Sequence, residues 1–262
     1  MLDAYDCTDT KTADLRGVYE TITKVVDIMG AKTIMPPVLV PYYYGTTADD
    51  DGISAFVLLK GGHFTIHTFP SRQCYFVDMM YDGFISEDKF RDVMLKELPA
   101  TSSSVASVDR RFCIQDQNKD MRIDEAKDFG PHYMIKSNEK IDLDINKIYD
   151  VLDRLPPQVN MTPIMRPVVI TNKVKNPKYI SGITMIAESH IAIHYDIENK
   201  SLFADIFSCS FIDSKDVSAT LARELGIKCE NILISRGTKH TNRHALRDQV
   251  ITRAARWREN IT

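Results

Sequence analysis

The sequence is poor in the residue patterns that mark metal, redox or nucleotide sites. It contains five cysteines, an odd number, and none is spaced as CxxC. Neither a disulfide framework nor a zinc site is therefore expected, and a reducing, cytoplasmic location is predicted. A Gly-rich phosphate loop and an HExxH motif are also missing, and no metal site is predicted. The cysteines are Cys7, Cys74, Cys113, Cys209 and Cys229.

Long apolar runs and strong charge are missing too. No stretch approaches the roughly 20 apolar residues that cross a bilayer, and the first ten residues do not resemble a secretory signal. The net charge is −3, so neither nucleic acid nor a membrane is expected as a partner. The 262 residues are 44% hydrophobic and 26% charged, an ordinary globular composition for one large or two small domains.

The two halves of the chain match each other. Residues 53–84 can be laid over residues 180–211 at a constant offset of 127, and eight positions are identical. Because these include two Ser/His/His sets at the same spacing, duplication explains them better than chance. We expect one half at 1–120 and the other at 121–262. The matched pairs are Ile53/Ile180, Ser54/Ser181, His63/His190, Ile66/Ile193, His67/His194, Phe76/Phe203, Asp78/Asp205 and Phe84/Phe211.

Each half has the pattern of helix, strands, helix. Apolar residues recur at helical spacing over about 11–29, and alternating β-rich runs follow. Polar residues 109–131 are interpreted as the connector between halves. Two such halves would bury one sheet face under helices and the other against the sister sheet. The predicted fold is therefore α+β, a four-layer α-β-β-α sandwich with an internal pseudo-twofold. Further helices are expected at about 86–97, 143–154 and 214–225, and strands at about 73–80 and 201–207, with Asp88 or Asp213 and Ser214 as helix starts.

Two segments of the second half carry a family resemblance. AESHIAIH at 187–194 is followed by FADIFSC at 203–209, which places Cys209 twenty residues after Ser189. A Ser-Gly pair, Ser181-Gly182, lies eight residues before Ser189. This arrangement resembles the processing-site region of bacterial S-adenosylmethionine decarboxylases, whose halves would here be fused in tandem.

The resemblance implies a lyase that makes its own cofactor. Autocatalytic cleavage of the zymogen between Glu188 and Ser189 would convert Ser189 into a covalent pyruvoyl group, a form of pyruvate, and give chains 1–188 and 189–262 that stay associated. That group would hold an amino-acid-type substrate as a Schiff base during decarboxylation, and Cys209 would return a proton. The pathway implied is polyamine (spermidine) biosynthesis. Whether the fused chain forms a homodimer is left open, as is activation by putrescine.

The resemblance also implies that each site is shared between halves. Ser189, Glu188 and Cys209 would combine with Ser54 and His67, which assist processing. The opposite site would combine Ser181 and His194 with Gly62 and Asp82 and would be inactive, because glycine has no hydroxyl. His63 and His190 are assigned structural roles.

The substrate is less firmly indicated than the chemistry. Ser71 stands where the family has a ribose-binding Glu, and Ala48 where it has an adenine-stacking aromatic ring. Glu139 is a candidate for facing the substrate. The inserted acidic run Asp49, Asp50 and Asp51 could pair with a basic amino acid. The predicted substrate is S-adenosylmethionine, with arginine or ornithine as the alternative. A third hypothesis is that the chain is an unprocessed, inactive regulatory paralogue.

Overall fold

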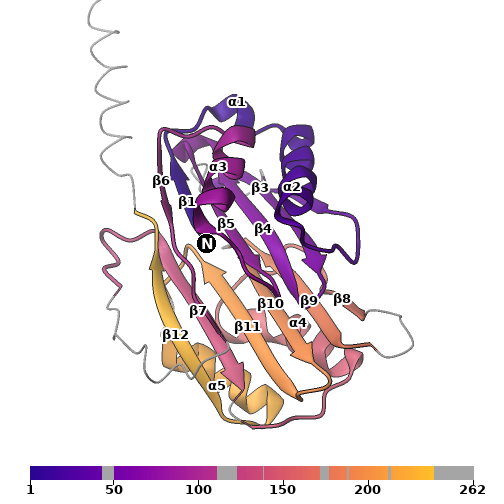
Figure 1. The fold of residues 1–262 in the computed structure, drawn as a ribbon. Helices are drawn as coiled ribbons and strands as arrows, with labels where there is room; N and C mark the ends of the chain where they lie inside the picture. Colours follow the sequence, from indigo (N-terminus) through magenta and orange to yellow (C-terminus); the bar gives the residue numbers. More distant parts are fainter. Residues whose placement is uncertain are drawn as a thin grey trace, which may run out of the picture.

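The structure is a computed structural model that describes residues 1–42, 50–110, 123–137, 139–171, 177–187, 189–211 and 214–238. Within them the strands form two six-stranded antiparallel sheets, ordered β2-β3-β4-β5-β1-β6 and β12-β7-β11-β10-β9-β8 (Figure 1). The first sheet comprises β1 (Leu2–Tyr5), β2 (Val38–Tyr42), β3 (Gly52–Leu59), β4 (Gly62–Phe69), β5 (Cys74–Met80) and β6 (Ser102–Val105). The second comprises β7 (Gly130–Ser137), β8 (Val168–Thr171), β9 (Tyr179–Ile186), β10 (Ser189–Asp196), β11 (Ser201–Ser208) and β12 (Cys229–Arg236).

Helices accompany each sheet close to the predicted positions. The first sheet carries α1 (Asp9–Thr12), α2 (Leu15–Met29), the 3₁₀ turn η2 (Pro70–Arg72) and α3 (Glu87–Glu97); the second carries α4 (Ile145–Gln158) and α5 (Ser214–Leu225). Helix α2 begins where the Asp14 side chain accepts from the Arg16 amide, and it ends at Gly30, whose φ of 74° suits glycine. The expected start of α3 at Asp88 is wrong by two residues. Ser86 caps it, because its hydroxyl accepts the amide of Lys89.

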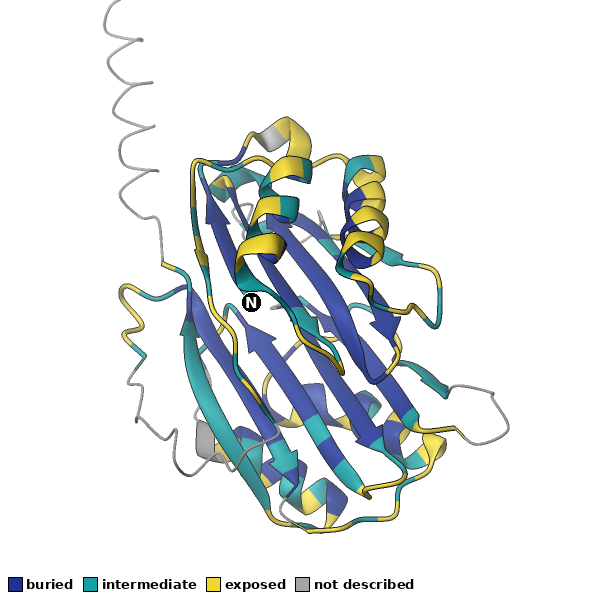
Figure 2. Ribbon diagram, viewed as in Figure 1, coloured by how far each residue is buried: buried dark blue, intermediate teal, exposed yellow. Residues whose placement is uncertain are grey.

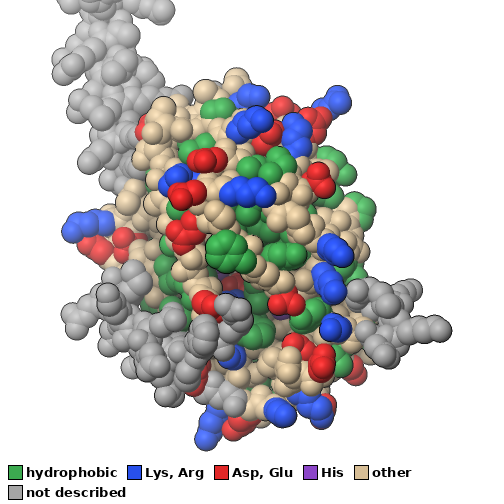
Figure 3. Space-filling model, in the orientation of Figure 1, with side chains coloured by type: hydrophobic (Ala, Val, Ile, Leu, Met, Phe, Trp, Pro, Cys, Tyr) green, Lys and Arg blue, Asp and Glu red, His purple; other side chains and the backbone are tan. Residues whose placement is uncertain are grey.

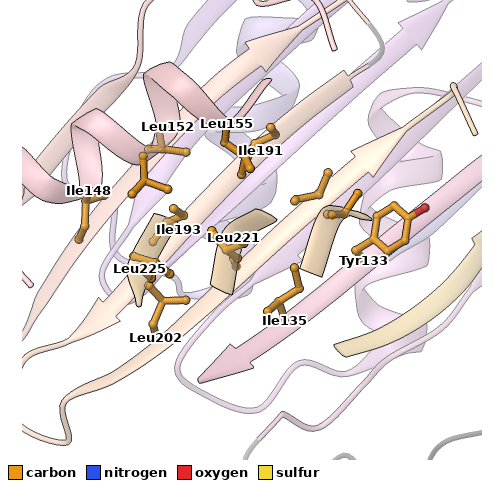
Figure 4. Close-up of a cluster of buried hydrophobic side chains, with 14 of the residues drawn as sticks. Tyr133, Ile135, Ile148, Leu152, Leu155, Ile191, Ile193, Leu202, Leu221 and Leu225 are labelled. Carbon is orange, nitrogen blue, oxygen red and sulfur yellow. The ribbon is translucent and has the colours of Figure 1, made fainter. Parts of the chain in front are cut away.

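Each sheet has a core of its own on the face that its helices cover. Val18 and Ile22 of α2 and Phe90 of α3 pack against apolar side chains of β3–β5. In the second half, Ile148 and Leu152 of α4 pack with the β-strands in the same way (Figure 4). Burial is nearly continuous along the central strands of both sheets (Figure 2). Fully burying such a side chain contributes about 1.5–3 kcal/mol, so each half supplies a substantial part of its own stability.

The remaining sheet faces contact one another. Phe56 and Leu58 of β3 cluster with Ile183 and Met185 of β9 and with Ala192 of β10. This contact explains why the inward positions of both sheets are apolar except at a few polar or charged side chains. Among the described residues, no helix is long and apolar enough to span a membrane.

The strand pairing keeps the repeat in register. Ser54 lies opposite His67 in the β3–β4 pair. Ser181 lies opposite His194 in the β9–β10 pair. The matched serines and histidines therefore occupy equivalent places in the two sheets, as duplication predicts.

Candidate active site

Ser189 is the first residue of β10 and has an unusual backbone and side chain. Its φ is 150°, in a region that favours glycine and that L-residues rarely adopt. It is 2% exposed, and its Oγ is buried without a hydrogen-bond partner. A buried hydroxyl that makes no hydrogen bond costs roughly 1–3 kcal/mol. The site thus holds both backbone strain and an unsatisfied nucleophilic oxygen. Glu188, predicted to supply the other side of the cleaved bond, lies outside the described residues.

A chain of hydrogen bonds crosses between the sheets next to Ser189. Ser54 Oγ lies 2.9 Å from His67 Nδ1, and His67 Nε2 lies 2.8 Å from His190 Nδ1. The two imidazoles stack with centroids 5.0 Å apart and planes 6° from parallel. His190 Nε2, the far end of this chain, is buried without a partner. The structure therefore joins the predicted helpers Ser54 and His67 to His190, for which the sequence predicts only a structural role.

Burial sets the charge of these histidines. It lowers the pKa of His67 to about 3 and holds the pKa of His190 well below its ordinary value. Both rings are therefore neutral at pH 7, and each carries one N–H. In a neutral pair only one nitrogen of each contact donates, so a proton moved at one end of the chain changes the tautomers along it.

Cys209 directly follows β11, whose last residue, Ser208, lies opposite Ser189 in the β10–β11 ladder. Cys209 is partly buried against a cluster of aromatic side chains. Phe129 and Phe76 stack within it, with centroids 4.2 Å apart. The sheet thus brings Cys209 to the same end as Ser189, and aromatic rings wall that end. The cluster comprises Tyr5, Phe69, Cys74, Phe76, Phe129 and Phe207.

A second hydrogen-bond chain, without an equivalent of Ser189, lies beside the first, with the rings of His63 and His190 5.5 Å apart. Ser181 Oγ lies 3.0 Å from His194 Nδ1, and His194 Nε2 lies 2.7 Å from His63 Nδ1. Gly62 takes the place of Ser189, and a Cβ built there would lie 2.0 Å from the Met80 carbonyl oxygen. The first half therefore lacks the room for a side chain as well as the hydroxyl.

Two arginines, Arg236 buried and Arg110 partly buried, connect the halves, and the sequence did not reveal either. Arg110 donates from Nη1 to both carboxylate oxygens of Asp205, at 2.8 and 2.7 Å. Arg236, 2% exposed, donates to Asp78 and Asp3. Burial raises the pKa of Asp78, but the positive groups around it, of which the Arg236 guanidinium has the largest effect, together hold that pKa far below its usual range. Each arginine thus comes from one half and neutralises an aspartate of the other.

The predicted substrate-binding residues are scattered. Asp50 pairs with Arg72 at 2.7 Å, so its charge is already neutralised within the chain. Ser71 lies beside Arg72 in η2. One buried oxygen of Asp51 has no partner. Asp49 lies outside the described residues.

Glu139 is not brought to Ser189. It is exposed just beyond the end of β7, whose opposite end, Gly130, adjoins Ser208 and Cys209. Substrate contact by Glu139, and by the acidic run Asp49, Asp50 and Asp51, stays a prediction.

His63, His194 and Asp205 form a group with the chemistry of a metal site. Their potential ligand atoms lie within 4.8 Å of one another. Each already has a protein partner, however, because the two histidines bond to each other and Arg110 binds the aspartate. The group therefore reads as a closed network of hydrogen bonds and an ion pair.

A cavity of about 980 Å³ opens at the Gly62 end, with apolar and acidic side chains around a hollow in the face shown in Figure 3. His63, His194 and Asp205 lie in its wall, as do Tyr179 and Asp82, whose hydroxyl and carboxylate are 2.8 Å apart. The opening thus lies at the end expected to be inactive.

The fold and the paired serine–histidine chains define a two-sheet α+β protein made of matched halves. A family model, S-adenosylmethionine decarboxylase, matches residues 1–111 and 134–237, one region per sheet. The chain belongs to the S-adenosylmethionine decarboxylase family, with two family halves in tandem. Among solved structures it is similar to the adenosylmethionine decarboxylase from Aquifex aeolicus VF5, with 21% identity and a TM-score of 0.36, over 44% of this chain and 97% of that one. No curated protein matches.

Proposed function

We propose that the chain is a self-processing, pyruvoyl-dependent decarboxylase that cleaves itself between Glu188 and Ser189. The observation that carries the proposal is Ser189 itself. Its φ of 150° strains the backbone at the bond to be broken, and its buried Oγ has no competing hydrogen bond. A residue that only packed the core would be expected in an ordinary conformation with its hydroxyl satisfied.

The processing chemistry balances with groups of this chain and one water. Ser189 Oγ attacks the Glu188 carbonyl carbon, and the peptide C–N bond breaks as an ester forms. A base then removes the Ser189 α-proton, the Cβ–Oγ bond breaks, and Glu188 leaves as a carboxylate. The dehydroalanine left behind tautomerises, and water replaces its nitrogen, which departs as ammonia. The products are chains 1–188 and 189–262.

The chain from Ser54 through His67 to His190 supplies the groups for proton movement in this scheme. Neutral imidazoles accept protons, and the unpartnered Nε2 of His190 belongs to the residue next to Ser189. A pyruvoyl group at position 189 would supply an electrophilic carbonyl that withdraws electrons from the substrate's bond to its carboxylate. Cys209, at the same end of the sheet, is the proposed proton donor. In the proposed four-layer sandwich with a pseudo-twofold, the first sheet contributes Ser54 and His67 to the Ser189 end, and the second sheet contributes His190.

S-Adenosylmethionine is the proposed substrate, and polyamine biosynthesis the proposed pathway. The family match supports it. The alternative, arginine or ornithine, was motivated by the acidic run, but Asp50 is engaged by Arg72. An internal guanidinium at that carboxylate competes with a guanidinium or ammonium of the substrate.

Two measurements test the proposal. Mass spectrometry of the denatured protein should find chains 1–188 and 189–262, the second beginning with a blocked, ketone-bearing terminus. Purified protein should release CO2 from S-adenosylmethionine in preference to arginine, ornithine and lysine. An intact chain without decarboxylation would instead identify an inactive paralogue.

A further inference from the structure

The cavity at the Gly62 end is not used by the proposed reaction. We propose that it is a second, non-processing small-molecule site, which binds a cationic nucleoside of the sulfonium type without converting it. The ligand class rests on the proposed function, because it is the class of the substrate. The existence of the site rests on the cavity, its charge and its aromatic wall.

The charge of the wall favours a cation. Six carboxylates line the cavity. Arg236 and Arg110 neutralise Asp78 and Asp205, and the other four carboxylates face the basic side chain of Lys136. Asp78 lies in the wall at 3% exposure, and its Oδ2 is buried without a hydrogen-bond partner. An unsatisfied buried carboxylate oxygen is costly, and a ligand donor would satisfy it. The carboxylates are Asp78, Asp82, Glu87, Asp109, Asp196 and Asp205.

The aromatic side chains favour a ligand with a flat body. Tyr81, Phe84, Tyr179 and Phe203 all line the cavity. Phe84 is 92% exposed, a large apolar surface that gains stability when covered. A volume of about 980 Å³ lies at the upper end of the range for small-molecule sites, so a nucleoside with a side chain fits.

The matched halves explain why the two ends would bind related ligands. The chain from Ser181 through His194 to His63 repeats, within 0.1 Å at each contact, the chain from Ser54 through His67 to His190. Gly62 lacks the hydroxyl that would become the cofactor and the room for any side chain. The Gly62 end would therefore still bind the ligand but could not form the cofactor that converts it.

The experiment uses the full-length, unprocessed Ser189→Ala protein and measures S-adenosylmethionine binding by isothermal titration calorimetry. Asp82→Asn and Ala106→Trp both alter the cavity; Ala106 lies in its wall but is exposed, so a tryptophan there should not prevent folding. Each is expected to weaken binding at least tenfold. Ser104→Trp, exposed on β6 outside the cavity wall, is the matched control and should bind as Ser189→Ala does. A short aliphatic diamine, a cation without a flat body, should bind at least tenfold more weakly than S-adenosylmethionine.

Three results would overturn the inference. They are no binding to Ser189→Ala, binding unchanged by both cavity substitutions, and a diamine that binds as tightly as the nucleoside. Failure of the proposed function looks different: the wild-type chain would stay intact and release no CO2, whatever the cavity binds.

Discussion

His67 Nε2 and His190 Nδ1 lie 2.8 Å apart although they belong to different sheets and are 123 residues apart in the chain. This contact makes His190 part of the Ser189 end.

Replacing His190 should slow self-cleavage. His190→Ala removes the far end of the hydrogen-bond chain and leaves His67 Nε2 buried without a partner, at a cost of about 1–3 kcal/mol. The half-time of cleavage, followed on denaturing gels after synthesis, should lengthen at least tenfold.

His63→Ala is the matched control, because it breaks the equivalent bond to His194 at 2.7 Å. It should lower stability similarly and still cleave. Equal rates for the two variants would assign His190 a purely structural role.

Ser189→Ala should abolish cleavage and decarboxylation together while the protein folds normally. Its thermal midpoint should match or exceed that of the unprocessed wild type, because the unsatisfied Oγ is removed. Mass spectrometry should find only the full 262-residue chain. Any cleavage at the same bond would contradict the role of the hydroxyl.

Gly62→Ser should not create a second cleavage site. Its Cβ would meet the Met80 carbonyl oxygen at 2.0 Å, and backbone would have to move. Overpacking of this kind costs about 1–3 kcal/mol, which urea unfolding would measure. Lys60→Ser, an exposed neighbouring change, should alter the free energy of unfolding by less than about 0.5 kcal/mol.

Arg236→Ala should be the most destabilising of these changes. It leaves Asp3 and Asp78 buried without their guanidinium, and breaking a buried ion pair on one side costs about 3–5 kcal/mol. Arg166→Ala, which removes an ion pair on the surface with Asp153, should shift the urea midpoint far less, because solvent screens an exposed pair. Comparable urea midpoints for the two variants would show that the buried network contributes little.

Mild acid should destabilise the protein before its carboxylates titrate. Burial lowers the pKa of His67 to about 3 and also lowers the pKa values of His63, His190 and His194, whereas unfolded histidines titrate near 6.5. The unfolded chain therefore binds more protons below pH 6.5. Stability is complete above that pH and falls on acidification, by up to ~1.4 kcal/mol per pH unit for each histidine. Urea unfolding at pH 7.5, 6.0 and 5.0 measures the slope; a flat profile would contradict these neutral histidines.

Much of the fold could be predicted because the repeat has a constant offset. The matching of His63 with His190 and of Ser54 with Ser181 already fixed which strands correspond. Apolar spacing predicted a helix at about 11–29, which the structure divides into α1 and α2, and α4 continues four residues beyond the expected end at 154. The cap at Ser86 was not predicted; this serine, two residues upstream of Asp88, accepts the amide hydrogen bond.

The rest depends on contacts that local sequence does not encode. Arg110 was assigned to a polar connector, yet it reaches an aspartate 95 residues away. Phe129, at the other end of that connector, is 3% exposed and packs at the Ser189 end. Side chains such as Phe129 fill the space at the Ser189 end, and the cavity opens at the Gly62 end. The sequence could place the Ser189 end and the Gly62 end, but it could not show which of them has a cavity.

The strand order has a consequence for the cleaved protein. A cut before Ser189 would leave β7, β8 and β9 in one product and β10, β11 and β12 in the other. In the second sheet, β7 lies between β11 and β12, while β9 borders β10. Strands of the two products would therefore alternate within one sheet. They would be held together by three hydrogen-bonded ladders and by the ion pairs of Arg236 with Asp3 and Asp78. Breaking one peptide bond would thus change the chemistry of the molecule, but the two products could separate only if all three ladders broke.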